Sequence, residues 1–307
     1  MPGFIRSRSK VADSLVQIGG EVPRLAQRLP QWARKGRTHF ESLNRLKRGL
    51  RQLNLHTVCE SARCPNIHDC FHRGAATFMI LGNRCTRGCG FCSVPKSRHP
   101  GALDPDEPAN VARMAADMRL RHVVITSVNR DDLPDGGSEH FAATVREVRR
   151  VLAGNARVEV LTPDFQGDLA AVARVLDAEP HIFNHNMETV PRLYRRVRPQ
   201  ADYRQSLDVL GFAKRYRPAA LTKSGAMLGL GETSDEVHQL LRDLRAADVD
   251  IVTLGQYLQP TRRNLPVSQF VPPVQFDAYR DFGLSLGFKI VFSGPLVRSS
   301  YMADLVA

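Results

Sequence analysis

Six cysteines gathered in one short stretch constrain this chain more than any other feature. They form a first trio (Cys59, Cys64 and Cys70) and a second trio (Cys85, Cys89 and Cys92), and the other 301 of the 307 residues include no cysteine. The disulfide framework of a secreted protein would spread its bridges along a smaller chain. Clustered thiols instead favour metal binding in a reducing compartment. Each trio nevertheless lacks the fourth thiolate that a metal centre usually has.

The rest of the chain alternates between short apolar runs and helical patterns. We predict strands at residues 76–81, 121–128, 156–164, 180–186, 220–231, 249–258 and 288–294. Their apolar runs are nearly continuous, which is typical of parallel strands covered on both faces. Between them we predict a helix at 138–152 with Ser138 as its N-cap, and one at 233–244 that opens with a capping box from Thr233 to Glu236. Such units form a parallel sheet, either doubly wound or barrel-like.

The charge is strongly basic and unevenly distributed. The formal net charge is +12, with eleven Lys or Arg against three acids in residues 1–50 and eight against two in residues 189–217. These patches suit an anionic partner. Aromatic residues make up only 7% and do not interleave with the basic runs, so we expect an acidic protein surface rather than nucleic acid. Without an 18-residue apolar run or an export signal, we expect no membrane span and a cytoplasmic location.

The second trio has the spacing C-x3-C-x2-C on one short loop. Gly88 and Gly90 would let that loop curl, and three thiolates on a four-iron cluster leave one iron open. A zinc site completed by His99 is the alternative. The spacing, with the aromatic Phe91 before the last cysteine and a strand just upstream, resembles the radical S-adenosylmethionine (SAM) superfamily. The resemblance implies that SAM binds the open iron, that its cleavage yields a 5′-deoxyadenosyl radical, and that Phe91 lies beside the adenine.

The first trio has the rarer spacing C-x4-C-x5-C. Read alone, it could be a zinc site with His56, His68 or His72. Together the two trios resemble the lipoyl synthase family, as do "VCESARCPN", "ATFMILGNRCTRGCGFC", "VVITSVNRDDLPDGG" and "GPLVRSSY", and the likeness covers roughly residues 40 to 305. It implies a partial (β/α)6-type TIM barrel of parallel strands with N- and C-terminal extensions. We divide the chain into four parts: a basic extension (1–50), a segment with the first trio that would hold an auxiliary cluster (51–74), the barrel (75–290), and a C-terminal segment that would close on the auxiliary cluster (291–307).

The family resemblance also implies a reaction. Two sulfur atoms would be inserted at C6 and C8 of an octanoyl group on a carrier-protein lysine, with the sulfur taken from an auxiliary 4Fe–4S cluster held by the first trio. The fourth ligand of that cluster would be Ser300, with Ser299 as the fallback. The cofactors are two 4Fe–4S clusters and SAM. The partners are an octanoylated lipoyl carrier domain or glycine-cleavage H-type protein, an electron donor such as ferredoxin or flavodoxin, and an iron–sulfur carrier. A eukaryotic source would place the enzyme in the mitochondrial matrix.

Further candidates come from strand ends and basic runs. We expect four polar residues to contact SAM: Asn129, Glu159, Asn184 and Lys223. Capping or core hydrogen bonding is the alternative for each. Arg195 and Arg198 are expected to bind the acidic substrate protein, with a simply solvated basic face as the alternative. His185 is expected to be structural.

Three alternative functions belong beside the leading one. Another two-cluster radical SAM sulfur transferase, of biotin-synthase or methylthiotransferase type, is the nearest. A ferredoxin-like electron carrier would have a fourth cysteine for each cluster and no barrel. A zinc-bearing nucleic-acid binder would contain no iron.

Overall fold

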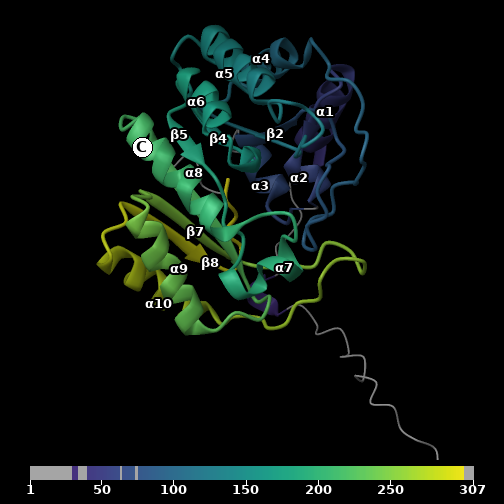
Figure 1. The fold of residues 1–307 in the computed structure, drawn as a ribbon. Coiled ribbons are helices and arrows are strands. Elements are labelled where there is room, and N and C mark those ends of the chain that lie inside the picture. Colours follow the sequence, from purple (N-terminus) through teal and green to yellow (C-terminus); the bar gives the residue numbers. More distant parts are fainter. Residues whose placement is uncertain (1–29, 34–39, 63, 73–74, 301–307) are drawn as a thin grey trace, which may run out of the picture.

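One curved sheet organises the computed structural model, which describes residues 30–33, 40–62, 64–72 and 75–300 (Figure 1). Its strands, hydrogen-bonded in sequence order, are β1 (His56–Thr57), β2 (Ala75–Ile80), β3 (His122–Ser127), β4 (Arg157–Leu161), β5 (Ile182–Asn184), β6 (Leu221–Leu228), β7 (Ile251–Gln256) and β8 (Ile290–Gly294). The short β1 runs antiparallel to β2, and every later neighbour pair is parallel. Within the described ranges β1 and β8 are the two edges, so the sheet curves into a barrel without closing.

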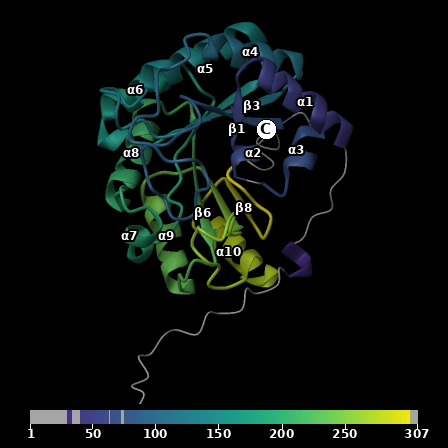
Figure 2. The same ribbon diagram turned by 90° about the vertical axis from the view of Figure 1, so that its right-hand side faces the viewer.

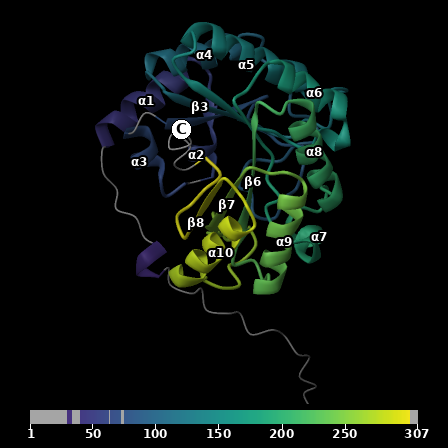
Figure 3. The ribbon, with the colours of Figure 1, turned by 90° about the vertical axis from the view of Figure 1, so that its left-hand side faces the viewer.

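Helices cover the outer face of this sheet. Those that follow the parallel strands are α4 (Glu107–Asp117), α5 (Ser138–Leu152), α6 (Leu169–Asp177), α8 (Tyr203–Tyr216), α9 (Ser234–Ala246) and α10 (Pro273–Ser285). Short turns of helix lie between them, η2 (Phe165–Gly167), η3 (Pro191–Leu193) and α7 (Tyr194–Val197). Figure 3 shows the helices as an arc around the strands. The six strand–helix units and the final β8 confirm the predicted partial barrel.

The seven predicted strands are confirmed, and their burial explains why they could be recognised. All six residues of β7 are buried, as are five of the six in β2 and in β3. Two apolar cores lie between the strands and the outer helices. One lies mainly between β2–β5 and α4–α6, and the other mainly between β6–β8 and α9–α10. Strands enclosed by such cores and by the barrel interior need apolar residues on both faces.

The predicted helix starts had different outcomes. The capping box of Thr233 and Glu236 is present at the start of α9. At α5 the prediction was wrong, because the N-cap is Gly137 and Ser138 is the first helical residue. The carboxylate of Asp135 supplies the missing acceptor, since Gly137 N and Glu139 N donate to it at 3.0 and 2.9 Å. The carboxylate of an acid just outside the helix therefore accepts the N-terminal hydrogen bonds that we expected Ser138 to accept.

The open side of the barrel is occupied by the segments at the two ends of the described chain. The N-terminal side contributes η1 (Gln31–Ala33), α1 (Phe40–Gln52), α2 (Val58–Ser61) and α3 (Ile67–His72). Asn66, between α2 and α3, is fully buried and donates through Nδ2 to the carbonyl oxygen of Leu296 at 2.7 Å. Figure 2 shows α2 and α3 beside β8 at this opening. The first-trio segment and the chain after β8 thus meet across the gap.

Two predictions concern residues that are only partly described. Most of the basic extension predicted for residues 1–50 lies outside the described residues, although its last part forms most of α1. The C-terminal segment predicted for residues 291–307 is described as far as Ser300. Among the helices of the described ranges, none has the length and apolar character needed to cross a membrane.

Candidate active site

A cavity of about 270 Å³ lies at the carboxyl ends of the parallel strands, and the second trio lines it. We call it the second-trio cavity. Its wall combines all three cysteines of that trio with residues from β3, β4, β6 and β7 and from the loops that follow the strands. This is the end of a barrel where side chains from several strands converge on one guest. The location agrees with the prediction that the trio follows the first parallel strand.

Contacts with distant segments fix the second-trio loop. Gly90 N donates to Val197 O at 2.9 Å, and Leu265 N donates back to Gly90 O at 3.0 Å. A Cβ on Gly90 would lie 2.8 Å from Leu265 Cγ and 3.2 Å from Arg196 O. Glycine is therefore required at this position by close packing, whereas the sequence interpretation attributed it to a curled backbone. At Gly88 the same Cβ would meet only Gln200, at an ordinary 3.5 Å.

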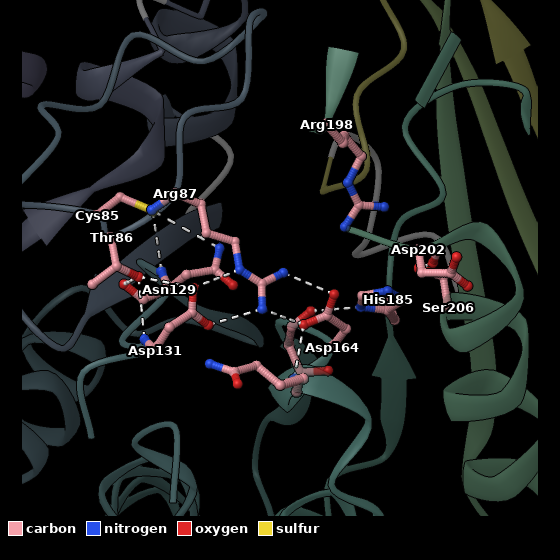
Figure 4. Close-up of polar contacts among 12 residues, drawn as sticks. Cys85, Thr86, Arg87, Asn129, Asp131, Asp164, His185, Arg198, Asp202 and Ser206 are labelled. Atoms are coloured by element: carbon pink, nitrogen blue, oxygen red, sulfur yellow. Dashed lines mark hydrogen bonds and ion pairs between the residues drawn. The ribbon is translucent and has the colours of Figure 1, made fainter. Parts of the chain in front are cut away.

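The guanidinium of Arg87 anchors the same loop to the barrel. It forms ion pairs with Asp131, in the loop after β3, and with Asp164, just after β4, each with a shortest N–O distance of 2.7 Å (Figure 4). Burial alone would raise the pKa of Asp164, but the hydrogen bonds and charge of Arg87 outweigh it and lower that pKa to about 2. Both carboxylates are thus ionised at neutral pH and share one buried cation.

Four buried polar atoms in the cavity wall have no hydrogen-bond partner among the described residues. They are Ser127 Oγ, Thr162 Oγ1, His185 Nε2 and Asn186 Oδ1. An unsatisfied buried polar group costs about 1–3 kcal/mol, and buried polar groups are normally paired. A guest with several polar groups would satisfy them, and SAM, with its amino, carboxylate and ribose groups, fits this requirement.

His185, which we expected to be structural, lies in the wall of the second-trio cavity. Its Nδ1 lies 2.9 Å from Thr162 O, while Nε2 is the unpartnered atom. Burial, assisted by the charge of Arg198, lowers the pKa of His185 to about 4. The imidazole is therefore neutral at pH 7, and when Nδ1–H donates to the carbonyl, Nε2 becomes an acceptor. His185 thus has a structural contact and also a free acceptor at the cavity.

The predicted SAM-contacting residues fall into two groups. Phe91 and Asn129 line the second-trio cavity, so the structure brings them to the expected place. Glu159, Asn184 and Lys223 line neither this cavity nor the one described below. Lys223 Nζ instead donates to both carboxylate oxygens of Glu159 at 2.9 and 3.1 Å, and Asn184 Nδ2 donates to Glu159 Oε1 at 3.0 Å. These three residues form a fully buried network lower in the barrel, in which Asn184 Oδ1 has no hydrogen-bond partner among the described residues. Their direct contact with SAM gains no support from this geometry.

The two arginines predicted to bind the substrate protein are also differently placed. Arg195 is exposed on α7. Arg198 is 8% exposed, lines the second-trio cavity and donates to Asn186 O at 2.9 Å. Only Arg195 is therefore available on the surface for a docking protein, whereas Arg198 faces the barrel mouth.

A second cavity, of about 370 Å³, is lined by the whole first trio and by Ser300. We call it the first-trio cavity. It borders the second-trio cavity, and the residues that line both are Val58, Phe91, Cys92, Val94, Met227, Arg298 and Ser299. Ser300 belongs to the first-trio cavity alone. The hydroxyl of Ser93 also donates to Ser61 O at 2.6 Å, which ties the second-trio loop to α2.

Gly255 in β7 lets the C-terminal segment reach this position. A Cβ there would collide with the carbonyl oxygen of Val297 and lie 3.3 Å from Arg298 Nη1. The chain after β8 can therefore pack directly against the carboxyl end of β7 only because position 255 has no side chain. The two serines that follow Arg298 are brought to the first trio in this way.

In each trio, burial makes a thiol a poor free nucleophile. Burial raises the pKa of Cys89 to about 11. Burial, reinforced by the neighbouring Cys64 and Cys70, raises the pKa of Cys59 as well. Thiols of this kind become thiolates when a metal centre binds, because the metal displaces the proton.

Within the described ranges, no three His, Cys, Asp or Glu side chains lie close enough to share a single metal ion. The ligands of one zinc ion must converge on one point, whereas the thiolates of a cubane hold separate irons. The zinc alternatives with His99, His56 or His68 therefore gain no support. The side chain of His72 lies outside the described residues.

Comparison with known proteins gives a consistent result. The family model described as the radical SAM superfamily matches residues 79–244, and the model of the N-terminal domain of lipoyl synthase matches residues 6–64. Lipoyl synthase of Caldanaerobacter subterraneus is 53% identical over 91% of this chain and 96% of its own length. The Thermus thermophilus enzyme is 54% identical over 90% and 86%, and the Burkholderia mallei enzyme is 50% identical over 98% and 91%.

Solved structures support the fold. Methylornithine synthase superposes with a TM-score of 0.51 at 16% identity, covering 86% of this chain and 87% of that one. SuiB of Streptococcus suis bound to S-adenosylmethionine gives a TM-score of 0.54 at 10% identity, covering 74% and 53%. At these identities the likeness concerns the barrel only.

Proposed function

Because this chain belongs to the lipoyl synthase family and is a radical SAM sulfurtransferase, we propose that it inserts sulfur at C6 and C8 of an octanoyl group. The octanoyl group is an amide on a lysine of a carrier protein. Carbon–hydrogen bonds at saturated carbons require a radical, so each sulfur inserted consumes one SAM. One observation carries the proposal: the cavities of the two cysteine trios share a wall.

The second-trio cavity is the proposed site of SAM and its cluster. Cys85, Cys89 and Cys92 would hold three irons of the cluster and leave the fourth iron to SAM. When bound, this cluster supplies the electron that cleaves SAM into methionine and a 5′-deoxyadenosyl radical. Phe91 would pack beside the adenine, and the unpartnered His185 Nε2 would accept a hydrogen bond from the cofactor. The apolar wall around them excludes water from the radical.

The first-trio cavity is the proposed site of the sulfur donor. Cys59, Cys64 and Cys70 hold an auxiliary 4Fe–4S cluster that is consumed as a substrate. Ser300 is the proposed fourth ligand, because it lines this cavity and not the other, whereas Ser299 lines both. An alkoxide is a harder ligand than a thiolate and suits a cluster that must give up sulfide.

The octanoyl chain would then lie where both cavities meet. Phe91, Val94 and Met227 provide an apolar lining at this place. The hydrogen atoms at C6 and C8 would face the second-trio cavity, and the sulfur donor would lie on the other side of the chain. The alternative of a biotin-synthase or methylthiotransferase type is not favoured, because the relatives above are lipoyl synthases at about half identity.

The remaining partners are proposals of the same kind. A basic surface that includes Arg195 suits an acidic lipoyl carrier domain or H-type protein. A ferredoxin or flavodoxin would reduce the clusters, an iron–sulfur carrier would rebuild the consumed one, and the reducing chemistry suits the cytoplasm.

Anaerobic reconstitution tests this function. The protein is loaded with iron and sulfide, and then SAM, dithionite and an octanoyl-lysine peptide are added. We expect about eight irons per chain, from two four-iron clusters, and a peptide carrying two new sulfur atoms. About four irons, or 5′-deoxyadenosine released without sulfur insertion, would contradict the proposal.

A matched pair of variants tests the serine ligand. Ser300→Ala should alter the Mössbauer spectrum of the first-trio cluster and abolish sulfur insertion, while the second-trio cluster still cleaves SAM. Ser299→Ala, one residue away in the same segment, should keep the parental spectrum. The reverse pattern would move the ligand to Ser299, and unchanged spectra in both variants would exclude a serine ligand.

A further inference from the structure

The three thiols of the second trio differ in the hydrogen bonds they receive. Cys85 Sγ accepts from Asn129 N at 3.3 Å, from Arg87 N at 3.4 Å and from Asn129 Nδ2 at 3.8 Å. Cys92 has one such donor, the backbone of Val94. Among the described residues, none donates to Cys89 Sγ. Cys85 is therefore the thiol that the protein surrounds with N–H groups.

The donors on Cys85 are held by pairing between two segments. Thr86 N donates to Asn129 O at 3.1 Å, and Asp131 N donates to Thr86 Oγ1, also at 3.1 Å. Together with the bond from Asn129 N to Cys85 Sγ, these contacts align the cluster loop with the chain after β3 (Figure 4). The place of Asn129 relative to the sulfur therefore depends on how firmly the two segments stay together.

The side chain of Arg87 locks that pairing. Its Nε and Nη2 lie 2.7 and 2.8 Å from the two oxygens of Asp131, and its Nη1 and Nη2 lie 2.8 and 2.7 Å from those of Asp164. Arg87 is 5% exposed and Asp164 is fully buried, so water screens the ion pair between them little. The planar guanidinium of arginine has five N–H donors and can bind two carboxylates at once, whereas the ammonium group of lysine cannot reproduce this geometry.

We propose that Arg87 is a positioning residue whose two carboxylate contacts hold Asn129 against Cys85 Sγ and so raise the electron affinity of the cluster on the second trio. The inference rests on the proposed function, because it takes this trio to be the ligands of the SAM-binding cluster. Reduction adds negative charge to the cluster and its sulfurs. N–H groups directed at a thiolate stabilise the reduced form more than the oxidised form, which makes the reduction potential more positive.

Arg130 provides a matched control in the loop after β3, the segment with which the second-trio loop pairs. It is 3% exposed, and it binds Asp132 through Nε and Nη2, both at 2.9 Å, and Leu81 O and Gly101 O through its guanidinium. Arg130 thus resembles Arg87 in burial and in its carboxylate contact. Its side chain makes no hydrogen bond to the second-trio loop among the described residues. A general loss of packing would affect both variants, whereas the proposed role concerns Arg87 alone.

The test is a redox titration followed by EPR in the absence of SAM. Arg87→Lys, Asn129→Leu and Arg130→Lys are compared with the parent, and a full chain carrying Cys59→Ala, Cys64→Ala and Cys70→Ala identifies the signal of the second-trio cluster. For Arg87→Lys and Asn129→Leu we expect the equilibrium constant of one-electron reduction to fall about tenfold, which is about 59 mV. Arg130→Lys should keep the parental potential.

The outcomes separate this inference from the proposed function. If the chain lacking the first trio holds no cluster, the ligand assignment is overturned and this inference with it. If that cluster forms, a parental potential in Arg87→Lys, or an equal shift in Arg130→Lys, overturns the role of Arg87 alone. If Arg87→Lys fails to hold iron, Asn129→Leu decides, because it keeps the guanidinium and removes one donor, and an unchanged potential there would also overturn the inference.

Discussion

Replacing Glu159 with glutamine should strongly destabilise the protein. The carboxylate is fully buried and receives hydrogen bonds from Lys223 and Asn184, and it lies 3.2 Å from His122 Nε2. Glutamine keeps the shape but removes the charge that balances the buried ammonium of Lys223. Removing one partner of a buried ion pair costs about 3–5 kcal/mol. This is a large part of the roughly 5–15 kcal/mol by which a domain is stable.

Anaerobic urea unfolding, monitored by far-UV circular dichroism, measures this change in the free energy of unfolding. Glu179→Gln is the control, since Glu179 is exposed and pairs with Arg149 and Arg217 on the surface, and its midpoint should match that of the parent. The double variant Glu159→Gln with Lys223→Met should be more stable than the sum of the single effects predicts, because neither charge is left alone.

Two results would refute this reasoning. A loss below about 0.5 kcal/mol for Glu159→Gln would place it among ordinary surface changes and would mean that Glu159 and Lys223 do not act as a buried ion pair. A large fall in SAM affinity for Lys223→Met, at unchanged stability, would instead indicate that Lys223 contacts SAM, as the sequence suggested.

Three further predictions follow from single contacts. Burial raises the pKa of Glu159, but Lys223 and His122 outweigh this and lower the pKa from 4.5 to about 2. The stabilising effect of the carboxylate is therefore present above pH 4.5 and is lost as the pH falls towards 2. Over that range the free energy of unfolding of the parent should fall by more than that of the Gln variant. Gly255→Ala should displace the segment after β8 and reduce sulfur insertion while SAM cleavage continues, as chromatography of product and 5′-deoxyadenosine would show. Gly90→Ala should cost about 1–3 kcal/mol by overpacking against Leu265 and lower the iron bound by the second trio, measured in the chain lacking the first trio.

The strands were predictable because burial on both faces leaves long apolar runs in the sequence. The position of each side chain along the barrel axis could not be predicted in the same way. Glu159 and Lys223 could be assigned to β4 and β6, but the register of neighbouring strands decides which residues reach the mouth. Lys223 pairs with Asn184 and Ile251 near the start of β6, and it therefore lies below the cavity. Sequence alone therefore assigns a residue to a strand, but it does not show how far along the barrel axis the side chain lies.

The residues that sequence reasoning missed share a signal that could have been used. Ser127 ends β3, Thr162 follows β4, and His185 follows β5. Each is a polar residue at the point where an apolar run stops, which is where a parallel barrel exposes side chains to its guest. The α5 cap was missed for another reason. Gly137 has φ of +83°, and a serine next to such a glycine cannot be distinguished from a cap without knowing the turn.

The wall shared by the two cavities has a consequence for how the enzyme would handle its substrate between the two insertions. C6 and C8 are separated by two bonds along one flexible chain. If the radical source and the sulfur donor border the same space, the half-finished acyl chain needs only to slide by that length before the second hydrogen is removed. The carrier protein would then stay docked while spent SAM is exchanged, and both insertions would take place during one encounter.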